Sequence, residues 1–414
     1  MSDKTGIEWT DATWNPIAGC SIVSPACTNC YAMAQAARIV RCAAGLGRAT
    51  HYADTVTTVK GKPVWTGEIR AAPDHVLTQP MRWRRPRRIF VNSMSDLFHE
   101  AVPDTWIDRI FAVMALAPQH TFQVLTKRPE RMRDYIESMT FRRLMDVVPR
   151  GKWPISHHQA MATLDPATTQ EHRDLYHVEC PGLPLPNVWL GVTAENQRMA
   201  DERIPVLLDT AAAKRFVSIE PMLGKINLES WLDPAEVCEG CDDGYGFGGR
   251  CKSDRTPRDE QCPWNRAVQV VKEHGPYDAG GAPASVTSTV MSLDWVICGG
   301  ESGPDARPMH PDWVRSIRDQ CAAAGTPFMM KQWGEWMPQV GARDGIDDSQ
   351  EQSRYRWAEW TDRWGTEGDH RWNYVDYPQW CDEMDPHHSV VRVGKRAAGR
   401  LLDGVEHNAF PGGV

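Results

Sequence analysis

Short apolar runs, each followed by polar residues and then by a segment with helical spacing, recur along the chain. This order is typical of a parallel α/β protein, in which each strand leads through a loop into a helix. The runs are Arg88–Asn92 (RIFVN), Thr121–Thr126 (TFQVLT), Asn187–Val192 (NVWLGV), Arg215–Ile219 (RFVSI), Asp294–Cys298 (DWVIC) and Pro327–Met330 (PFMM). With the stretch before Cys20 counted as a first strand, the pattern predicts seven β units.

Two of the intervening segments carry helix signals at both ends. Residues 103–118 (PDTWIDRIFAVMALAP) place apolar side chains at helical spacing, and Pro118 ends the pattern. Residues 310–327 (HPDWVRSIRDQCAAAGTP) have Pro311 in the first turn and Gly325 as a stop. Both segments are therefore expected to connect parallel strands as helices.

Seven β units joined by helices predict an α/β fold, in the form of a partial or complete (β/α) barrel of the TIM type. A doubly wound sheet is the alternative. We expect residues 1–233 and 291–342 to form the barrel. Residues 234–290 are rich in Cys and Gly and look like an insertion that could be a zinc subdomain. Residues 343–386 are an acidic, Trp-rich excursion, and residues 387–414 are a C-terminal segment that docks on the barrel.

Polar residues follow nearly every predicted strand, and the carboxyl ends of the strands are where (β/α) barrels carry their chemistry. The clusters are Asn92, Ser93 and Asp96; Thr126, Lys127 and Arg128; Thr193 and Glu195; Ser218 and Glu220; Glu301 and Ser302; and Lys331, Gln332 and Trp333. Any single one is explained by a loop meeting water. Six clusters on one rim predict a shared pocket.

Lys127 and Arg128 would place two cations at the barrel mouth, where they suit a carboxylate or a phosphate. A purely structural role for Arg128, paired with Glu130 or Asp134, is the alternative. Together with Asn92, Ser93, Asp96, Glu195, Gly299, Gly300 and Glu301, these two residues are the candidate cofactor-binding set.

Glu220 and Lys331 are the candidate catalytic residues. Glu220 lies between a buried-looking strand and Pro221, so it could act as an acid or base, or it could pair with Lys331 across the mouth. Gly299 and Gly300 offer unobstructed backbone N–H groups that suit an anion nest, and Glu301 suits a bound amine or ribose hydroxyl. A tight turn is the alternative for this last motif.

Three cysteines, Cys20, Cys27 and Cys30, lie within eleven residues and are followed by a helix-like run. A structural zinc site would need a fourth ligand, for which Cys42 and His51 are the nearest candidates. A [4Fe–4S] cluster held by three thiolates leaves one iron open to a small molecule. Buried structural thiols are the third reading, although the surrounding Gly, Pro and Asn residues indicate a loop.

Composition indicates the cellular compartment and the kind of partner. The N-terminus has no signal-peptide pattern and the chain has no long apolar run, which predicts a cytoplasmic protein with no membrane span. In that reducing compartment the 12 cysteines favour metal or cluster ligation over disulfides. The net charge of −8 argues against a general polyanion coat. The run MRWRRPRRIF (residues 81–90) is either a solvated segment before a strand or a phosphate-contacting arm with Trp83 as a stacking residue.

Several motifs together resemble the phage-type three-cysteine-motif family, whose members are regarded as relatives of the radical S-adenosylmethionine (SAM) enzymes. They are GIEWTDATWNPIAGCSIVSPACTNCYA, FVNSMSDLFH, LTKRPERM, VWLGVTAEN, SIEPMLG, DWVICGGESGPDARPM, PFMMKQWGEW and GKRAAGRLLDG. The resemblance spans almost the whole chain outside residues 234–290 and 343–386. It departs from the radical SAM loop in two places: the first gap between thiols is six residues where three is usual, and Asn29 replaces an aromatic residue.

The resemblance implies a (β/α) barrel with a [4Fe–4S] cluster on Cys20, Cys27 and Cys30 at its mouth. It further implies SAM as a cofactor, a cytosolic electron donor, and a 5′-deoxyadenosyl radical that abstracts hydrogen from a nucleotide or nucleic-acid substrate. The alternative function is a metal-stabilised nucleic-acid-binding protein without SAM chemistry.

A second set of cysteines, Cys238, Cys241, Cys251 and Cys262, begins with a Cys-x-x-Cys pair inside the insertion. That spacing suits structural Zn²⁺, although the second pair is further apart than in ordinary zinc knuckles. Free thiols and an auxiliary cluster are the alternatives.

Overall fold

The computed structural model of the chain describes residues 5–149, 153–164, 167, 169–170, 182–232, 268–269, 289–338, 356–361, 371–375 and 389–412. The cysteine set at 238–262 and most of the excursion at 343–386 lie outside these residues. In the described part of the chain, no helix is both long and apolar enough to cross a membrane.

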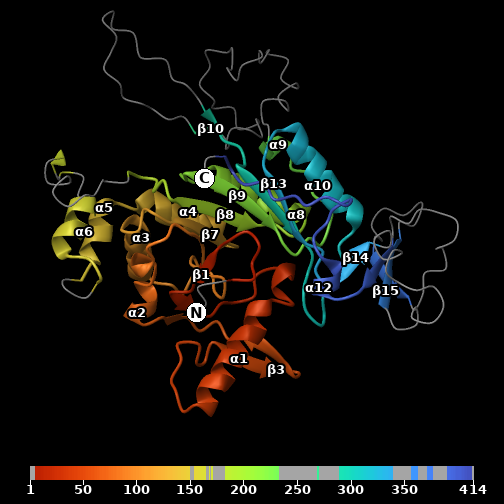
Figure 1. Cartoon of the computed structure of the whole chain (residues 1–414), viewed down its shortest axis with the longest axis horizontal. Helices are drawn as coiled ribbons and strands as arrows, with labels where there is room; N and C mark the ends of the chain where they lie inside the picture. The colour runs from red at the N-terminus through yellow and green to blue at the C-terminus, as the bar shows by residue number, and fades with distance from the viewer. Residues whose placement is uncertain are drawn as a thin grey trace, which may run out of the picture.

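The centre of the molecule is a parallel seven-stranded sheet curved into a half barrel (Figure 1). Its order is β1 (Ala12–Trp14), β6 (Arg88–Val91), β7 (Thr121–Thr126), β8 (Val188–Thr193), β9 (Lys214–Ile219), β12 (Trp295–Gly299) and β13 (Phe328–Gln332). Each strand lies beside the one that precedes it, so the order never reverses as it does in a doubly wound sheet. All seven predicted strands are present, and the mixed α/β fold is compatible with the partial form of the predicted barrel.

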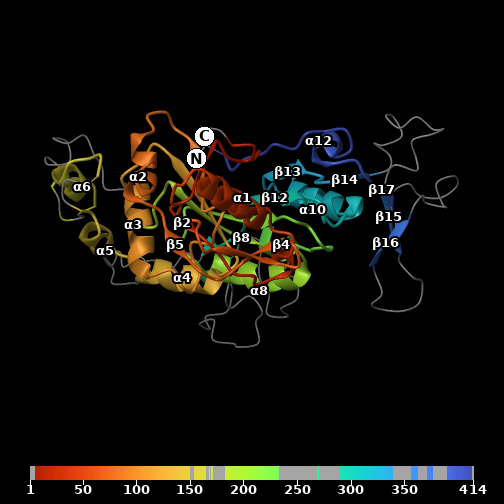
Figure 2. The same cartoon turned by 90° about the horizontal axis from the view of Figure 1, so that it is seen from below.

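Helices that connect the strands cover the outer face of the sheet (Figure 2). They include α3 (Asp104–Ala115), α4 (Pro129–Ser138), α8 (Gln197–Leu208) and α10 (Pro311–Ala323). The predicted starts of α3 and α10 are confirmed. Each helix ends two to three residues before its predicted stop, because Leu116 and Ala324 already leave the regular helix as C-caps.

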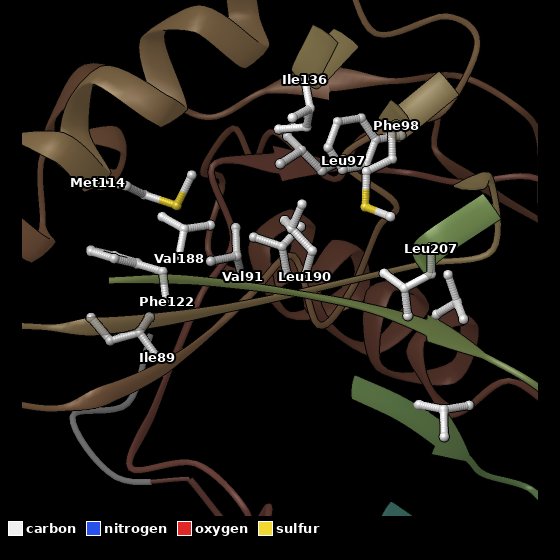
Figure 3. Packing of buried hydrophobic residues seen from close by; sticks show 14 of the residues in the cluster. Ile89, Val91, Leu97, Phe98, Met114, Phe122, Ile136, Val188, Leu190 and Leu207 are labelled. Atoms are coloured by element: carbon white, nitrogen blue, oxygen red, sulfur yellow. The ribbon is translucent and has the colours of Figure 1, made fainter. Parts of the chain in front are cut away.

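The outer face is held by aliphatic packing. Val91, Val188 and Leu190 of the sheet gather with Met114 of α3 and Leu207 of α8 (Figure 3). All five side chains are at most 3% exposed. Burial of such side chains contributes about 1.5–3 kcal/mol each, so this layer supplies much of the stability that holds the strand ends in place.

The inner face of the half barrel is filled by aromatic rings. Trp9, Phe90, Trp189, Phe216 and Trp295 form one buried cluster, in which neighbouring rings lie 4.5–6.3 Å apart. Tilted and edge-on rings at this spacing pack favourably. The tryptophan richness of the chain is thus explained in part by core packing, and these rings are not available to stack on a base.

Trp83, the candidate stacking residue, is also buried, at 9% exposure. Its backbone carbonyl accepts a hydrogen bond from Gln119, and its ring lies against His120 and under the guanidinium of Arg87. The reading of Trp83 as an intercalating side chain is therefore wrong.

The C-terminal segment runs along β13 and the open side of the aromatic cluster. The Met330 N–H donates to His407 O, and the Trp295 indole N–H donates to Ala409 O. The Trp333 backbone N–H donates to Gly399 O, and its indole N–H donates to Leu401 O. These bonds tie the segment that includes α12 (Lys395–Ala398) to the end of the sheet.

Smaller sheets lie around the half barrel. Strands β14 (Trp336–Pro338), β17 (Ser389–Arg392), β15 (Arg356–Thr361) and β16 (Arg371–Val375) form a four-stranded antiparallel sheet. Two-stranded pairs are formed by β2 (Ile17–Ala18) with β5 (Arg70–Ala71), by β3 (Val56–Val59) with β4 (Lys62–Trp65), and by β10 (Val268–Gln269) with β11 (Thr289–Val290). The remaining helices among the described residues are α1 (Tyr31–Gly45), α2 (Asp74–Leu77), α5 (Phe141–Asp146), α6 (His157–Leu164) and α9 (Glu229–Leu232), with short 3₁₀ turns at Pro25–Cys27 and Pro80–Arg82.

Candidate functional site

The three cysteines lie in the loop between β2 and α1, above the carboxyl ends of the sheet. Gly19 opens this loop with φ of +95° and bridges to Ser95, and a Cβ here would overlap the backbone oxygen of Glu68. Only glycine fits both constraints. We call residues 19–30 the three-cysteine loop; within it Cys27 is buried in a 3₁₀ turn, and Cys30 is the N-cap residue of α1.

The first anchor of the loop is Glu195, directly after β8. Its fully buried carboxylate accepts the Ala26 N–H at 3.2 Å and the Arg203 guanidinium at 3.1 Å. Burial alone would raise the pKa of Glu195, but the hydrogen bond from Ser24 and the charge of Arg203 hold that pKa below its ordinary value. Glu195 is therefore ionised and holds the loop in place, and its two carboxylate oxygens already accept hydrogen bonds from Ala26 and Arg203.

The second anchor is Arg128, directly after β7. Its guanidinium donates to Ser21 Oγ at 2.7 Å, Asp96 Oδ2 at 3.0 Å and Glu100 Oε1 at 2.8 Å. Asp96 also accepts from Thr126 Oγ1 at 2.7 Å, so its carboxylate ties the ends of β6 and β7 together. The alternative of a structural ion pair holds for Arg128, but the partners are Asp96 and Glu100 and not the helix residues named from the sequence.

The third anchor is Glu301, after β12. Arg307 binds both of its carboxylate oxygens, at 2.6 and 2.8 Å, and also donates to Pro25 O in the loop. Asn29 Nδ2 donates to the same carboxylate at 3.1 Å. Asn29, which stands where radical SAM loops have an aromatic residue, thus fastens the loop to the far side of the sheet.

The thiols are partly or fully buried and form no disulfides. Burial raises the pKa of the Cys20 thiol to about 12; Asp96 adds to this shift, whereas Arg128 and Lys127 oppose it. Burial also raises the pKa of Cys30, again against the charge of Lys127. Because thiolates are the metal ligands, metal loading has to displace protons from this loop, and the cation of Lys127 favours that step.

The donors in this loop are of the type that an iron–sulfur cluster uses. They are three free thiols, Cys20, Cys27 and Cys30. Within the described ranges, no three His, Cys, Asp or Glu side chains converge closely enough to hold a single metal ion. In a polynuclear cluster each thiolate binds a different iron, so the thiols do not have to converge on one point.

Glu220 and Lys331 form the ion pair that was one of the two readings of the sequence. The ammonium lies 2.6 and 2.7 Å from the two carboxylate oxygens, and Gln332 Nε2 donates to the same carboxylate at 3.0 Å.

Two candidate cofactor residues keep unused hydrogen-bonding capacity. Asn92, at the end of β6 with φ of +58°, is 2% exposed, and neither polar atom of its side-chain amide has a partner in the structure. Lys127 Nζ has one weak contact, to Thr193 Oγ1 at 3.5 Å, and no carboxylate of the described chain lies within ion-pair distance. Ser93, the residue after Asn92, accepts from Tyr31 through its carbonyl and donates through its hydroxyl to Asn15 Oδ1. Buried unpaired polar groups of this kind are costly unless a ligand satisfies them.

The anion nest expected at Gly299 and Gly300 is wrong for Gly300, whose N–H donates to Gln332 O at 2.9 Å. The reason for glycine is steric: a Cβ at Gly300 would overlap the carbonyl oxygen of Trp333. A Cβ at Gly299 would lie 3.4 Å from Glu220 Oε1, which is an ordinary contact.

We expect Gly300→Ala to lower the free energy of unfolding by about 1–3 kcal/mol, because the strand end must move away from the Trp333 backbone. Gly299→Ala is the matched control and should cost less. Urea unfolding of both variants measures the difference. Equal midpoints for the two variants would contradict the steric explanation.

The sequence did not identify Arg203 and Arg307, the cations that neutralise two of the anchors. Each follows its carboxylate at short range, Arg203 eight residues after Glu195 and Arg307 six residues after Glu301. An acid at a strand end followed by an arginine six to eight residues later occurs at both anchors, and that repeated spacing is the signal that could have found them.

Comparison with known proteins gives a family but no function. The family model described as "Protein of unknown function (DUF5131)" matches residues 4–411. No curated protein and no solved structure matches the chain. Any activity has to be inferred from the residues of the site.

Proposed function

We propose that this chain, which belongs to the DUF5131 family, is an iron–sulfur enzyme of the radical SAM type that acts on a nucleotide or nucleic-acid substrate. The observation that carries the proposal is the fastening of the three-cysteine loop. Glu195 and Glu301 accept hydrogen bonds from this loop and Arg128 donates one to it, and the three residues follow three different strands. Several charged anchors on one loop are expected where thiols must be held in one arrangement.

Cys20, Cys27 and Cys30 would hold a [4Fe–4S] cluster. When bound, the cluster supplies an electron and an open iron position at which the amino and carboxylate groups of SAM are held. The chain itself supplies the surrounding groups. Lys127, with no carboxylate partner among the described residues, suits the SAM carboxylate, and the unpaired amide of Asn92 suits a polar group of the same ligand.

The Glu220–Lys331 pair has a positioning role in this proposal. Its charges neutralise each other at 12–18% side-chain exposure, so neither group is an unpaired acid or base. The pair leaves a polar, nearly uncharged wall beside Gly299. Such a wall suits an uncharged part of a ligand, such as a ribose.

The test is anaerobic reconstitution of the full chain with iron and sulfide. We expect about four irons per chain and, after addition of SAM and dithionite, 5′-deoxyadenosine and methionine in equal amounts. Iron and sulfide analysis and chromatography measure these products. A fully loaded cluster that yields neither product, with or without added nucleic acid, would replace this proposal by a metal-stabilised nucleic-acid-binding protein. Binding of one zinc and no iron would reject the cluster itself.

A further inference from the structure

A basic segment projects from the sheet directly beside the three-cysteine loop. This basic arm, residues 31–71, consists of α1, the β3–β4 hairpin and β5, and α1 and β3 extend away from the half barrel in Figure 1. It contains six Lys and Arg but two Asp and Glu, a net charge of +4. The whole chain has a net charge of −8, so the other residues together carry −12. The basic arm is therefore a positively charged segment of an acidic protein.

Four of these cations are unpaired. Arg38, Arg41, Arg48 and Lys60 are exposed, and no carboxylate in the described part of the chain lies within ion-pair distance of them. Some other surface arginines of the protein are paired: Arg315 and Arg318 share Asp403 at 2.6–2.8 Å. Uncompensated neighbouring cations repel one another, so their retention here indicates an anionic partner.

The basic arm is packed against the three-cysteine loop. Met33 and Ala36 of α1 pack with Trp65 of β4 in a buried cluster against which Cys20 and Cys30 also pack. Lys62 on the hairpin pairs with Asp305, in the segment after β12, at 2.7 Å. A ligand held by the arm is therefore held at a set position relative to the thiols.

The geometry of the arm favours an extended polyanion over a single nucleotide. Arg38 lies about two turns along α1 from Cys30, roughly 12 Å at 1.5 Å per residue, and Arg41 follows on the same face. At about 3.4 Å per nucleotide, that distance spans several nucleotides of one strand. Guanidinium groups bind phosphate oxygens in pairs, and three of the four unpaired cations are arginines.

We propose that the basic arm binds the sugar–phosphate backbone of a polynucleotide and brings one nucleotide of that strand to the three-cysteine loop. The second half of this statement rests on the proposed function, whereas the binding does not. An anionic membrane is the competing partner, because Leu46 and Val59 are exposed at 67% and 50%. The apolar face of α1 is however already buried against Trp65, so no amphipathic face is free to enter a bilayer.

The experiment compares two double variants of the full chain. Arg38→Gln with Arg41→Gln removes two arm charges, and Arg142→Gln with Lys225→Gln removes two exposed charges that lie on α5 and after β9. Fluorescence anisotropy with a labelled mixed-sequence single-stranded DNA, and with RNA of the same sequence, measures affinity against salt. By counterion release the arm variant should lose about 1.4 from the slope of log K against log salt, or about 25-fold in affinity near 0.1 M. The control should lose little.

Equal losses in both variants, or none in the arm variant, would overturn the arm as the binding surface. Binding to phosphatidylserine vesicles without binding to either oligonucleotide would overturn the choice of partner. Iron content and SAM cleavage of the same variants separate the two proposals. If the chain binds oligonucleotide through the arm but loads no cluster, the arm proposal is supported and the radical SAM proposal is rejected. If the chain loads a cluster and cleaves SAM but binds no oligonucleotide, the radical SAM proposal is supported and the arm proposal is rejected.

Discussion

Cys30→Ser should abolish iron loading and SAM cleavage, and Cys42→Ser should leave both unchanged. Cys30 is the N-cap residue of α1 inside the three-cysteine loop, whereas Cys42 is an exposed free thiol on the same helix. A cluster with two thiolates in place of three loses a ligand that the serine hydroxyl replaces poorly, because an alkoxide forms far less readily than a thiolate. We expect iron to fall from about four per chain to near zero after anaerobic reconstitution.

Iron and sulfide analysis and the visible absorbance of the reconstituted protein provide the measurement. The Cys42 variant controls for general thiol loss, since it removes one sulfur from the same segment. Circular dichroism of both variants controls for folding. Full iron loading in a folded Cys30 variant, or equal losses in both variants, would show that the loop is not the cluster site.

The second large effect is expected at Arg203. Arg203→Met leaves the carboxylate of Glu195 fully buried without its cation, and breaking a buried ion pair in this way costs about 3–5 kcal/mol of unfolding free energy. Arg198→Met on the same helix is the control. Its partner Glu202 is half exposed, so the expected cost is about 1 kcal/mol or less. Urea unfolding measures both.

Changing Glu195 to Gln together with Arg203→Met should recover part of the lost stability, because no buried charge then remains. The same double variant should still load less iron than the wild type, since an uncharged amide oxygen, a weaker acceptor, then takes the Ala26 N–H that fastens the three-cysteine loop. If Arg203→Met and Arg198→Met are equally stable, Glu195 is not held as a buried charge, and the first anchor has been misidentified.

Local pattern was a good guide to the elements of the sheet. The prediction for β7, Thr121–Thr126, coincides with the strand, and β8 begins one residue after its predicted start. These strands are readable because parallel strands covered on both faces are continuous apolar runs bounded by polar residues. For the same reason, the sequence showed which polar residues follow each strand.

The roles of those polar residues were not readable. Asp96, Glu195 and Glu301 looked like ligands for a cofactor, yet each is engaged by an arginine of this chain. Whether a carboxylate faces a ligand or an internal cation depends on which loops meet above the sheet. That meeting joins residues as distant as Asn29 and Glu301, which lie 272 positions apart.

The amino-acid sequence by itself therefore determined the order of the strands, the helix starts and the position of the three thiols. Each of these depends on residues that are close in sequence, within one turn or one strand. The folded molecule added what distant contacts control: three ion-paired anchors on the loop, the aromatic filling of the inner face, and the unused hydrogen-bonding capacity of two candidate cofactor residues, Asn92 and Lys127. Burial explains the difference. A charged or polar side chain removed from water must find a partner, and the partner is chosen by the packing of the whole sheet and not by adjacent residues.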